Sequence, residues 1–192
     1  MLIVIGNGYS KTISDVNLFK NHTTYGCDYI YNRVIPDNLV SENIGITVEL
    51  IANGHTKKHV CHFRNFTLIP SFHYDMMKQT TDKRMKIAEN EPTTENFNWW
   101  GNEYDDWITE TVALRITCLE NPNETMYCVG YDYFHNQTSS GVYLGSSTTI
   151  SNVESQDWIV QHRKIEEEFP NCNFVFVGKD ISYPEFEKML HK

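Results

Sequence analysis

The chain lacks the patterns that would mark it as secreted, membrane-embedded or disulfide-linked. Its five cysteines contain no C-x-x-C pair and their number is odd, which favours free thiols in a reducing compartment over a disulfide framework. The opening apolar run, Met1–Ile5, has no basic flank and ends at Gly6, far too early for a signal peptide or a membrane span. These absences predict a soluble, cytoplasmic protein with no membrane segment.

Basic residues are also in short supply. Lys and Arg number 16 against 25 Asp and Glu, giving a net charge of −9. A broad nucleic-acid-binding face is therefore not expected, because it needs a surplus of cations, although a small basic pocket for one phosphate stays compatible. The motifs G-x-x-x-x-G-K and G-x-S-x-G are missing too, so the sequence gives no support for a P-loop nucleotide-binding protein or a serine hydrolase.

What the sequence does contain is an alternation of short apolar runs with segments of helical spacing. Strands are expected at Leu2–Ile5, Thr23–Cys27, Leu39–Val40, Val60–Phe63, Phe66–Ile69, Met126–Val129 and Phe174–Val177. Helices are expected around Ile13–Phe19, Val48–Ile51, Ile108–Leu119, Trp158–Phe169 and Phe186–Leu190. This order predicts one α/β domain over residues 1–192, with a doubly wound, mostly parallel sheet in a three-layer α/β/α arrangement.

One segment departs from this alternation. From Asp75 to about Asp106 the chain is polar and loses its periodicity, until Trp99 and Trp100 interrupt it. We interpret this segment as a lid or excursion and not as a linker between domains. The two tryptophans would anchor its return to the body of the protein.

The first candidate binding motif follows the first expected strand. Gly6 and Gly8 would let the backbone approach a ligand closely, and the helix start near Ser10 would offer free N–H groups to a phosphate. The amide of Asn7 can both donate and accept hydrogen bonds. These residues predict a nucleotide or phosphate site, with a plain tight turn as the alternative reading.

A second candidate, Gly130–Phe134, follows a later buried strand in the same way. Asp132 would then face the same crevice as Gly6–Gly8, or else only cap a loop.

The histidines do not form a convincing metal site. His55, His59 and His62 have metal-like spacing, but a strand at 59–63 would point His59 and His62 to opposite faces. Since no Cys or carboxylate completes the set, no metal is expected.

Four segments together resemble a known family. In order and spacing, Leu2–Ser10, Tyr25–Tyr31, Ile108–Thr111 and Met126–Phe134 are similar to the G-N-G-P-S, R-C-N-x-F-Y, I-T-S-G and I-Y-L-x-G-x-D-F-Y motifs of bacterial single-domain sialyltransferases. The chain also resembles short tailed-bacteriophage proteins of that superfamily, through Tyr25–Tyr31, Pro36–Val40 and Glu49–His55. The resemblance covers most of the chain outside the 75–106 segment.

The resemblance implies a Rossmann-like glycosyltransferase that uses a nucleotide-sugar donor, typically CMP-linked, and needs no metal or other cofactor. Asn7 would then lie against the nucleotide and Thr109 against its sugar and phosphate, while Tyr143 would hold the leaving phosphate. Glycosyl transfer needs a base within reach of the acceptor hydroxyl. Three residues are candidates for that base: His135, His162 and Asp132.

Three positions depart from the family pattern. Asp28 stands where the family has Asn, Glu110-Thr111 where it has Ser-Gly, and Phe134 where it has Tyr. Asp28 and Glu110 would bring negative charge to the nucleotide-binding site, beside the donor phosphate. In the resembled family, a histidine after the fourth motif acts as the general base. This chain has no clear counterpart of that histidine, and His135 and His162 are the nearby candidates.

Two readings of function stay open. The first is a phage-encoded glycosyltransferase in the host cytoplasm with an unknown acceptor, for example a hydroxylated phage DNA base. The second is a catalytically inactive relative that binds a nucleotide or a host protein to counter a defence system. A pyrophosphokinase is a weaker third hypothesis. Such an enzyme requires a pair of carboxylates that binds Mg²⁺, and the sequence offers no compelling pair. Self-association into a homo-oligomer is compatible with all three.

Overall fold

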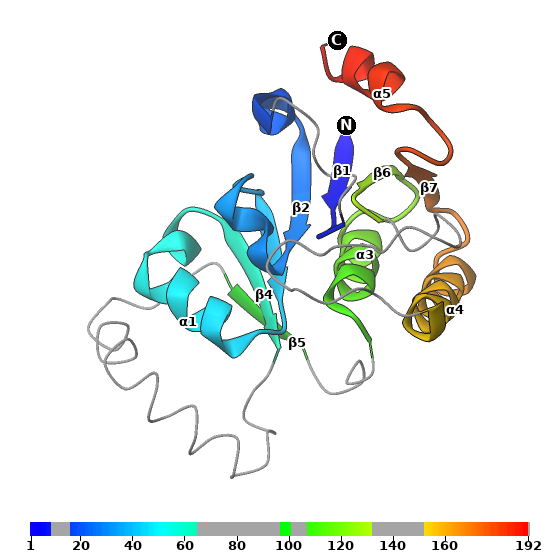
Figure 1. The fold of residues 1–192 in the computed structure, drawn as a ribbon. Coiled ribbons are helices and arrows are strands. Elements are labelled where there is room, and N and C mark those ends of the chain that lie inside the picture. The colour runs from blue at the N-terminus through cyan, green and yellow to red at the C-terminus, as the bar shows by residue number, and fades with distance from the viewer. Residues whose placement is uncertain (9–15, 65–96, 101–106, 132–151, 192) are drawn as a thin grey trace.

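Seven parallel strands and the helices between them make up the computed structural model, which describes residues 1–8, 16–64, 97–100, 107–131 and 152–191 (Figure 1). The strands are β1 (Leu2–Ile5), β2 (Thr23–Cys27), β3 (Asn38–Ser41), β4 (Val60–Arg64), β5 (Phe97–Trp100), β6 (Thr125–Val129) and β7 (Asn173–Phe176). The α-helices are α1 (Ile44–Ala52), α3 (Thr109–Glu120), α4 (Asn152–Glu168) and α5 (Tyr183–Leu190). Short 3₁₀ helices are η2 (Val16–Asn21), η3 (Asp28–Asn32) and η4 (His55–Lys57).

The strand order places β1 inside the sheet. The order is β5-β4-β3-β2-β1-β6-β7, with every pair parallel. Leu2 lies opposite Thr23 on one side and Met126 on the other. The predicted strand at Leu2–Ile5 is therefore present and lies inside the sheet, and its unbroken apolar sequence follows from being enclosed on both faces.

The order of the strands reverses between β1 and β6. Strands β1 to β5 are laid down outward in one direction, and β6 and β7 are then added on the other side of β1. In open parallel sheets, ligands bind outside the carboxyl ends of the strands at such a switch point. The predicted Rossmann-like, doubly wound α/β fold is confirmed, and it directs attention to the chain just after β1 and β6.

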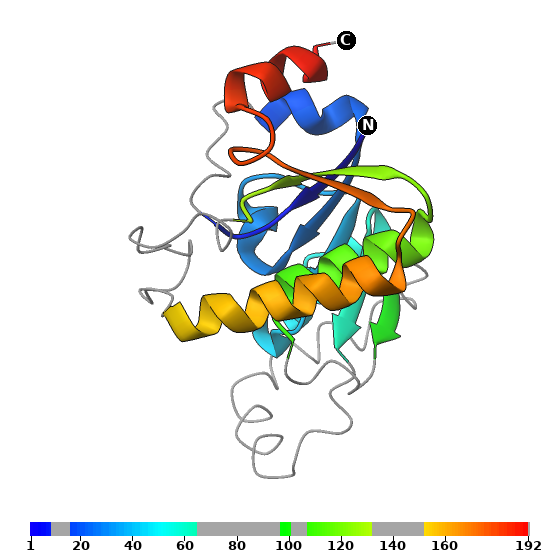
Figure 2. The same cartoon turned by 90° about the vertical axis from the view of Figure 1, so that its right-hand side faces the viewer.

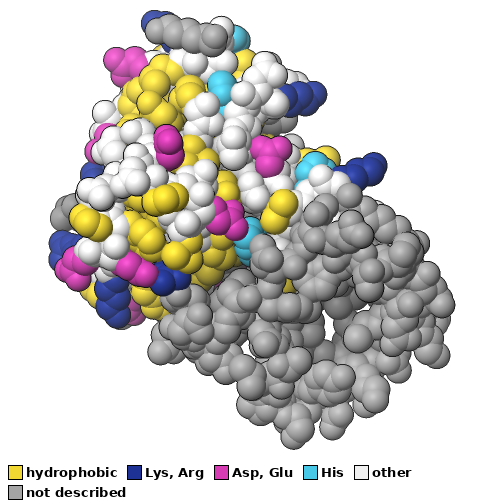
Figure 3. Space-filling model, turned by 180° about the vertical axis from the view of Figure 1, so that it is seen from behind, with side chains coloured by type: hydrophobic (Ala, Val, Ile, Leu, Met, Phe, Trp, Pro, Cys, Tyr) yellow, Lys and Arg dark blue, Asp and Glu magenta, His cyan; other side chains and the backbone are white. Residues whose placement is uncertain are grey.

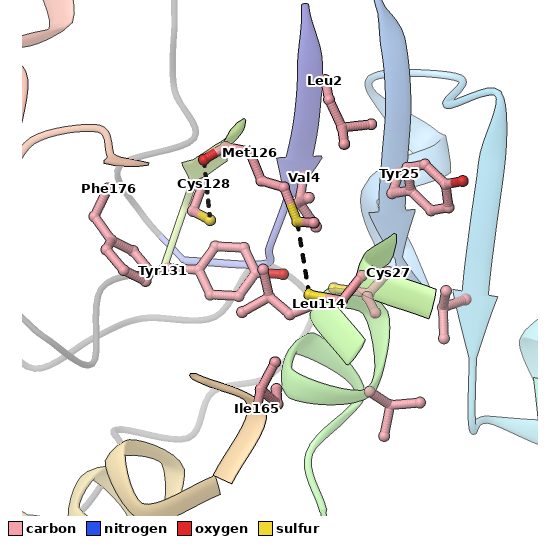
Figure 4. Packing of buried hydrophobic residues seen from close by; sticks show 14 residues of the cluster. Leu2, Val4, Tyr25, Cys27, Leu114, Met126, Cys128, Tyr131, Ile165 and Phe176 are labelled. Carbon is pink, nitrogen blue, oxygen red and sulfur yellow. Dashed lines mark hydrogen bonds between the residues drawn. The ribbon is translucent and has the colours of Figure 1, made fainter. Parts of the chain in front are cut away.

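Helices cover both faces of the sheet. Figure 2 shows α3 and α4 side by side across one face, with α5 and η2 on the opposite side. Alternate β1 residues feed the two cores: Leu2 and Val4 pack with the α3 and α4 residues, Ile3 and Ile5 with those of α1 and α5. Figure 4 shows the first of these cores, in which Tyr131 lies between Phe176 and the α3 residue Leu114. The three-layer arrangement follows from this alternation of side chains.

Most predicted elements are present, and two differ. The helix expected around Ile13–Phe19 is a 3₁₀ helix, Val16–Asn21, in the part that is described. Phe97–Trp100 pairs with β4 as strand β5, where no strand was expected, so Trp99 and Trp100 belong to the sheet. The rest of Asp75–Asp106 and the strand expected at Phe66–Ile69 lie outside the described residues, apart from 97–100.

The face of the protein seen in Figure 3 shows no large basic patch among the described residues. Figure 3 shows the face opposite to that of Figure 1, where the Lys and Arg side chains of the described residues lie apart from one another and form no single block. Among the helices described, none is long and apolar enough to cross a bilayer.

The close approach of β1 to the turn after β6 can be tested at Gly6. Its N–H donates to the Val129 carbonyl oxygen at 2.8 Å, and a Cβ on Gly6 would lie 2.7 Å from the backbone oxygen of Gly130. Because a backbone atom cannot swing aside, we expect Gly6→Ala to lower the free energy of unfolding by about 1–3 kcal/mol in urea titrations. Gly45→Ala, at an exposed position of α1, is the control: a Cβ there would meet only a side-chain atom, Asn43 Oδ1 at 3.1 Å, so the expected change is within about 1 kcal/mol and not a comparable loss. Equal effects of the two substitutions would contradict the close approach.

Candidate ligand-binding site

Four of the predicted site residues meet at the carboxyl edge of the sheet. Asn7 follows β1, Asp28 follows β2 directly, and Thr109 and Glu110 form the first turn of α3. Parallel strands bring their carboxyl ends to one edge, and α3 packs on β1, β2 and β3 with its first turn at that edge. We call Asn7, Asp28, Thr109 and Glu110 the strand-end cluster.

Asn7 joins β1 to α3. Its side-chain Nδ2 donates to Glu110 Oε1 and to Cys27 Sγ, each at 3.3 Å, and its backbone N–H also donates to the Glu110 carboxyl group. The residue is only 6 % exposed. Its Oδ1 accepts no hydrogen bond from any described residue. The amide is therefore held firmly at one end and has an unused acceptor at the other.

Asp28 has an unusual backbone conformation, and hydrogen bonds offset part of the cost of placing its charge at the site. Its φ of 43° is left-handed, a conformation that Asp tolerates better than most residues. Its carboxyl group accepts from Ser41 Oγ at 2.9 Å and from the Thr109 side chain and the Glu42 backbone. Burial, and then the neighbouring Glu110 charge, outweigh these hydrogen bonds and raise the pKa of Asp28 to about 6.

Glu110 is buried at the start of α3, with 6 % of its surface exposed. Burial raises its pKa, the N–H groups of Asn7 and of Glu110 itself lower it, and the charge of Glu42 raises it further. A carboxylate in the first helical turn is also favoured by the helix dipole. Glu110 therefore occupies the helix end that would otherwise attract an anion.

Two further contacts position this turn. Tyr131, just after β6, donates from its hydroxyl to the Glu110 carbonyl oxygen at 3.0 Å. Ile108 at the N-cap has no polar side chain; instead its N–H donates to Gln161 Oε1 of α4 at 3.2 Å, and Thr111 Oγ1 donates to the same oxygen at 2.6 Å. Contacts from several elements thus define the geometry of the strand-end cluster.

The glycines of the first motif are part of the same edge. Gly6 and Gly8 donate from their N–H groups to the Val129 and Gly130 carbonyl oxygens at 2.8 and 2.9 Å. The turn after β1 is therefore bound to the end of β6, at the switch point. Ser10, Asp132, His135 and Tyr143 lie outside the described residues.

His162, a predicted base, lies in the core between α4 and β7. Its ring contacts those of Phe174 and Phe176, with centroids 5.0 and 5.1 Å apart, and its Nε2 is 3.3 Å from Glu166 Oε1. Burial lowers its pKa. This environment suits packing and not proton transfer to an acceptor in solution.

The remaining histidines diverge. His55 and His59 stack with their centroids 4.5 Å apart, whereas His62 is 3.6 Å from Glu120 of α3. Within the described ranges, no group of three or more His, Cys, Asp or Glu side chains could hold a metal ion.

Sequence reasoning missed the β3 contribution to the site. Ser41 ends β3 and Glu42 follows it, and both contact or face the carboxyl groups of the cluster. The signal was present, because polar residues directly after any inner parallel strand reach the same edge as Asn7 and Asp28.

Comparisons of the chain with known protein families, with curated proteins and with solved structures gave no match. The resemblance to sialyltransferases stays a prediction based on the four motifs.

The buried charge of Asp28 predicts an unusual dependence of stability on pH. A carboxyl group whose pKa rises from 3.8 to about 6 on folding destabilises the fold when ionised, above pH 6, and has no such effect below its unfolded pKa. We expect Asp28→Asn, which keeps the Oδ1 acceptor and tolerates the left-handed backbone, to be more stable than wild type at pH 8 by up to about 3 kcal/mol. The gain should shrink as the pH falls from 6 to 4.

Denaturant titrations at pH 4, 6 and 8 would measure this gain. Asp157→Asn, at an exposed position of α4, is the matched control and should show no comparable gain. A pH-independent effect of Asp28→Asn would show that its carboxyl group is not buried against Glu110.

Proposed function

We propose that this protein binds a nucleotide at the carboxyl edge beside β1 and β6 and acts as a metal-independent, nucleotide-sugar-dependent glycosyltransferase. The observation that supports it best is the strand-end cluster. Its members come from three of the segments that resemble sialyltransferase motifs, and contacts join them at the switch point of the sheet.

The roles follow from this placement. Asn7 and Thr109 would hold the nucleotide, and Tyr143 would hold the leaving phosphate, as the resemblance implies. Because His162 is enclosed by Phe174 and Phe176, Asp132 and His135 are the stronger candidates for the base that deprotonates the acceptor hydroxyl. The donor would be CMP-linked.

The setting we propose is the cytoplasm of a phage-infected host, with a hydroxylated phage DNA base as one acceptor. The net charge of −9 disfavours a duplex bound along a broad face. A base presented singly, or free before incorporation, suits this chain better.

A second candidate function is nucleotide or host-protein binding without catalysis. The observation that favours it is the pair Asp28 and Glu110, in which the charge of Glu110 raises the pKa of Asp28, at the place where a transferase would hold a donor phosphate. No Lys or Arg among the described residues forms an ion pair with either of them. Two unit charges about 4 Å apart repel by roughly 4 kcal/mol at an effective dielectric of 20.

A ligand panel separates these functions. We expect CMP or CMP-linked sugar, compared with UDP, GDP and their sugars in thermal-shift assays, to stabilise wild type by about 2.7 kcal/mol at 100 times its dissociation constant. Asn7→Ala should lose most of this shift, whereas Asn53→Ala, at an exposed position after α1, should keep it. Release of sugar from the donor is then measured for each binding ligand.

Each outcome has a distinct meaning. Binding with turnover supports the transferase, and binding without turnover supports the inactive relative. A flat panel for all three nucleotides would remove the nucleotide-binding proposal.

A further inference from the structure

The hydrogen-bonding groups that the strand-end cluster offers to a ligand are acceptors. Asn7 Oδ1 is unpartnered among the described residues, in a side chain that is 6 % exposed. The opposite orientation of the amide would set its oxygen against the Glu110 carboxyl group, so donation from Nδ2 to Glu110 is the favoured arrangement. A buried acceptor without a partner is costly, and a donor group on a ligand would relieve that cost.

Asp28 adds a second acceptor of stronger kind. Its carboxyl group accepts from Ser41 Oγ at 2.9 Å and from the Thr109 side chain and the Glu42 backbone, which leaves about one of the four acceptor positions of a carboxylate for a ligand. Hydrogen bonds to an ionised acceptor are roughly twice as strong as those between neutral groups. The chemistry of the cluster therefore selects hydroxyl or amine groups.

A phosphate does not suit these acceptor atoms, because it is itself an anion without donor hydrogens. Asp28 and Glu110 are both acidic and lie close enough to raise the pKa of Asp28. The first turn of α3, a natural anion site, already holds the carboxyl group of Glu110. Negative groups of a ligand would have to lie away from these two residues.

The place of Asp28 in the fold indicates which group of the ligand donates the hydrogen bond. In parallel sheets that bind dinucleotides, an acidic residue about 20 residues after the glycine turn, at the end of the second strand, accepts a hydrogen bond from a ribose hydroxyl. Asp28 directly follows β2, beside β1, about 20 residues after Gly8. We propose that Asp28 is the ribose-recognition residue of this protein and that Asn7 Oδ1 accepts a second hydrogen bond from the same nucleoside.

This inference rests on the proposed nucleotide binding and makes it more specific. Asp28 and Glu110, which stand where the resembled family has Asn and Ser, then indicate which end of the ligand lies beside them. That end is the nucleoside, whereas the phosphate and the sugar to be transferred lie elsewhere along the edge. A site of this kind distinguishes ribonucleotides from deoxyribonucleotides.

Isothermal titration of wild type tests this with whichever of CMP, UDP and GDP binds in the panel, together with its 2′-deoxy and 3′-deoxy forms. Loss of the recognised hydroxyl should weaken binding about tenfold or more, the usual effect of deleting a hydrogen bond to a charged group. Asp28→Asn should reduce this discrimination several-fold, whereas Asp157→Asn should leave it intact.

The outcomes separate this inference from the proposed function. If all three nucleotides fail to bind wild type, nucleotide binding itself is refuted. If one binds and both deoxy forms bind equally well, nucleotide binding stands and ribose recognition is overturned. That comparison uses wild type alone and does not depend on the folding of any variant. Full discrimination retained in Asp28→Asn would overturn the assignment to Asp28.

Discussion

The first turn of α3 holds the carboxyl edge of this sheet together. Through Asn7 it is joined to the end of β1, through Asp28 to the end of β2, and through Tyr131 to the end of β6. Gln161 ties the same turn to α4. Because one helical turn is the common partner of so many elements, a shift of that turn would displace every polar group of the candidate site at once. The precision of the site therefore depends on how well α3 packs beneath the sheet.

This arrangement has an energetic cost that the rest of the fold must offset. The buried Glu110 and the partly buried Asp28 lie near one another at the edge, and the Asn7 amide oxygen has no partner among the described residues. Natural proteins tolerate such groups mainly where function requires them. The two apolar cores, one on each face of the sheet, supply the stability that makes this local cost tolerable. Placement of the polar groups at the sheet's end, and not within either core, keeps the two demands apart.

The fold was largely predictable from sequence because parallel strands enclosed by helices leave a direct mark on it. Leu2–Ile5 and Thr23–Cys27 are strands with the bounds expected. Strand β5 was missed, because the aromatic run Phe97–Trp100 gives no sign of its partner β4, more than thirty residues earlier. At the site, the motif resemblance singled out Asn7, Asp28, Thr109 and Glu110, but not the hydrogen bonds that Asp28 accepts from Ser41 and from the backbone of Glu42. Those contacts depend on the pairing of β3 with β2, which local patterns do not encode.

The central position of β1 also governs the order in which the protein can assemble on the ribosome. Leu2–Ile5 precedes the other described strands in the chain, yet one of its two partners, β6, follows more than a hundred residues later. At roughly 5–20 residues per second, the most apolar strand of the chain waits many seconds with one edge unpaired. Asn7 and Glu110 are likewise separated until α3 has emerged. The growing chain therefore passes through a long interval in which the edge of β1 that will pair with β6 has no strand beside it.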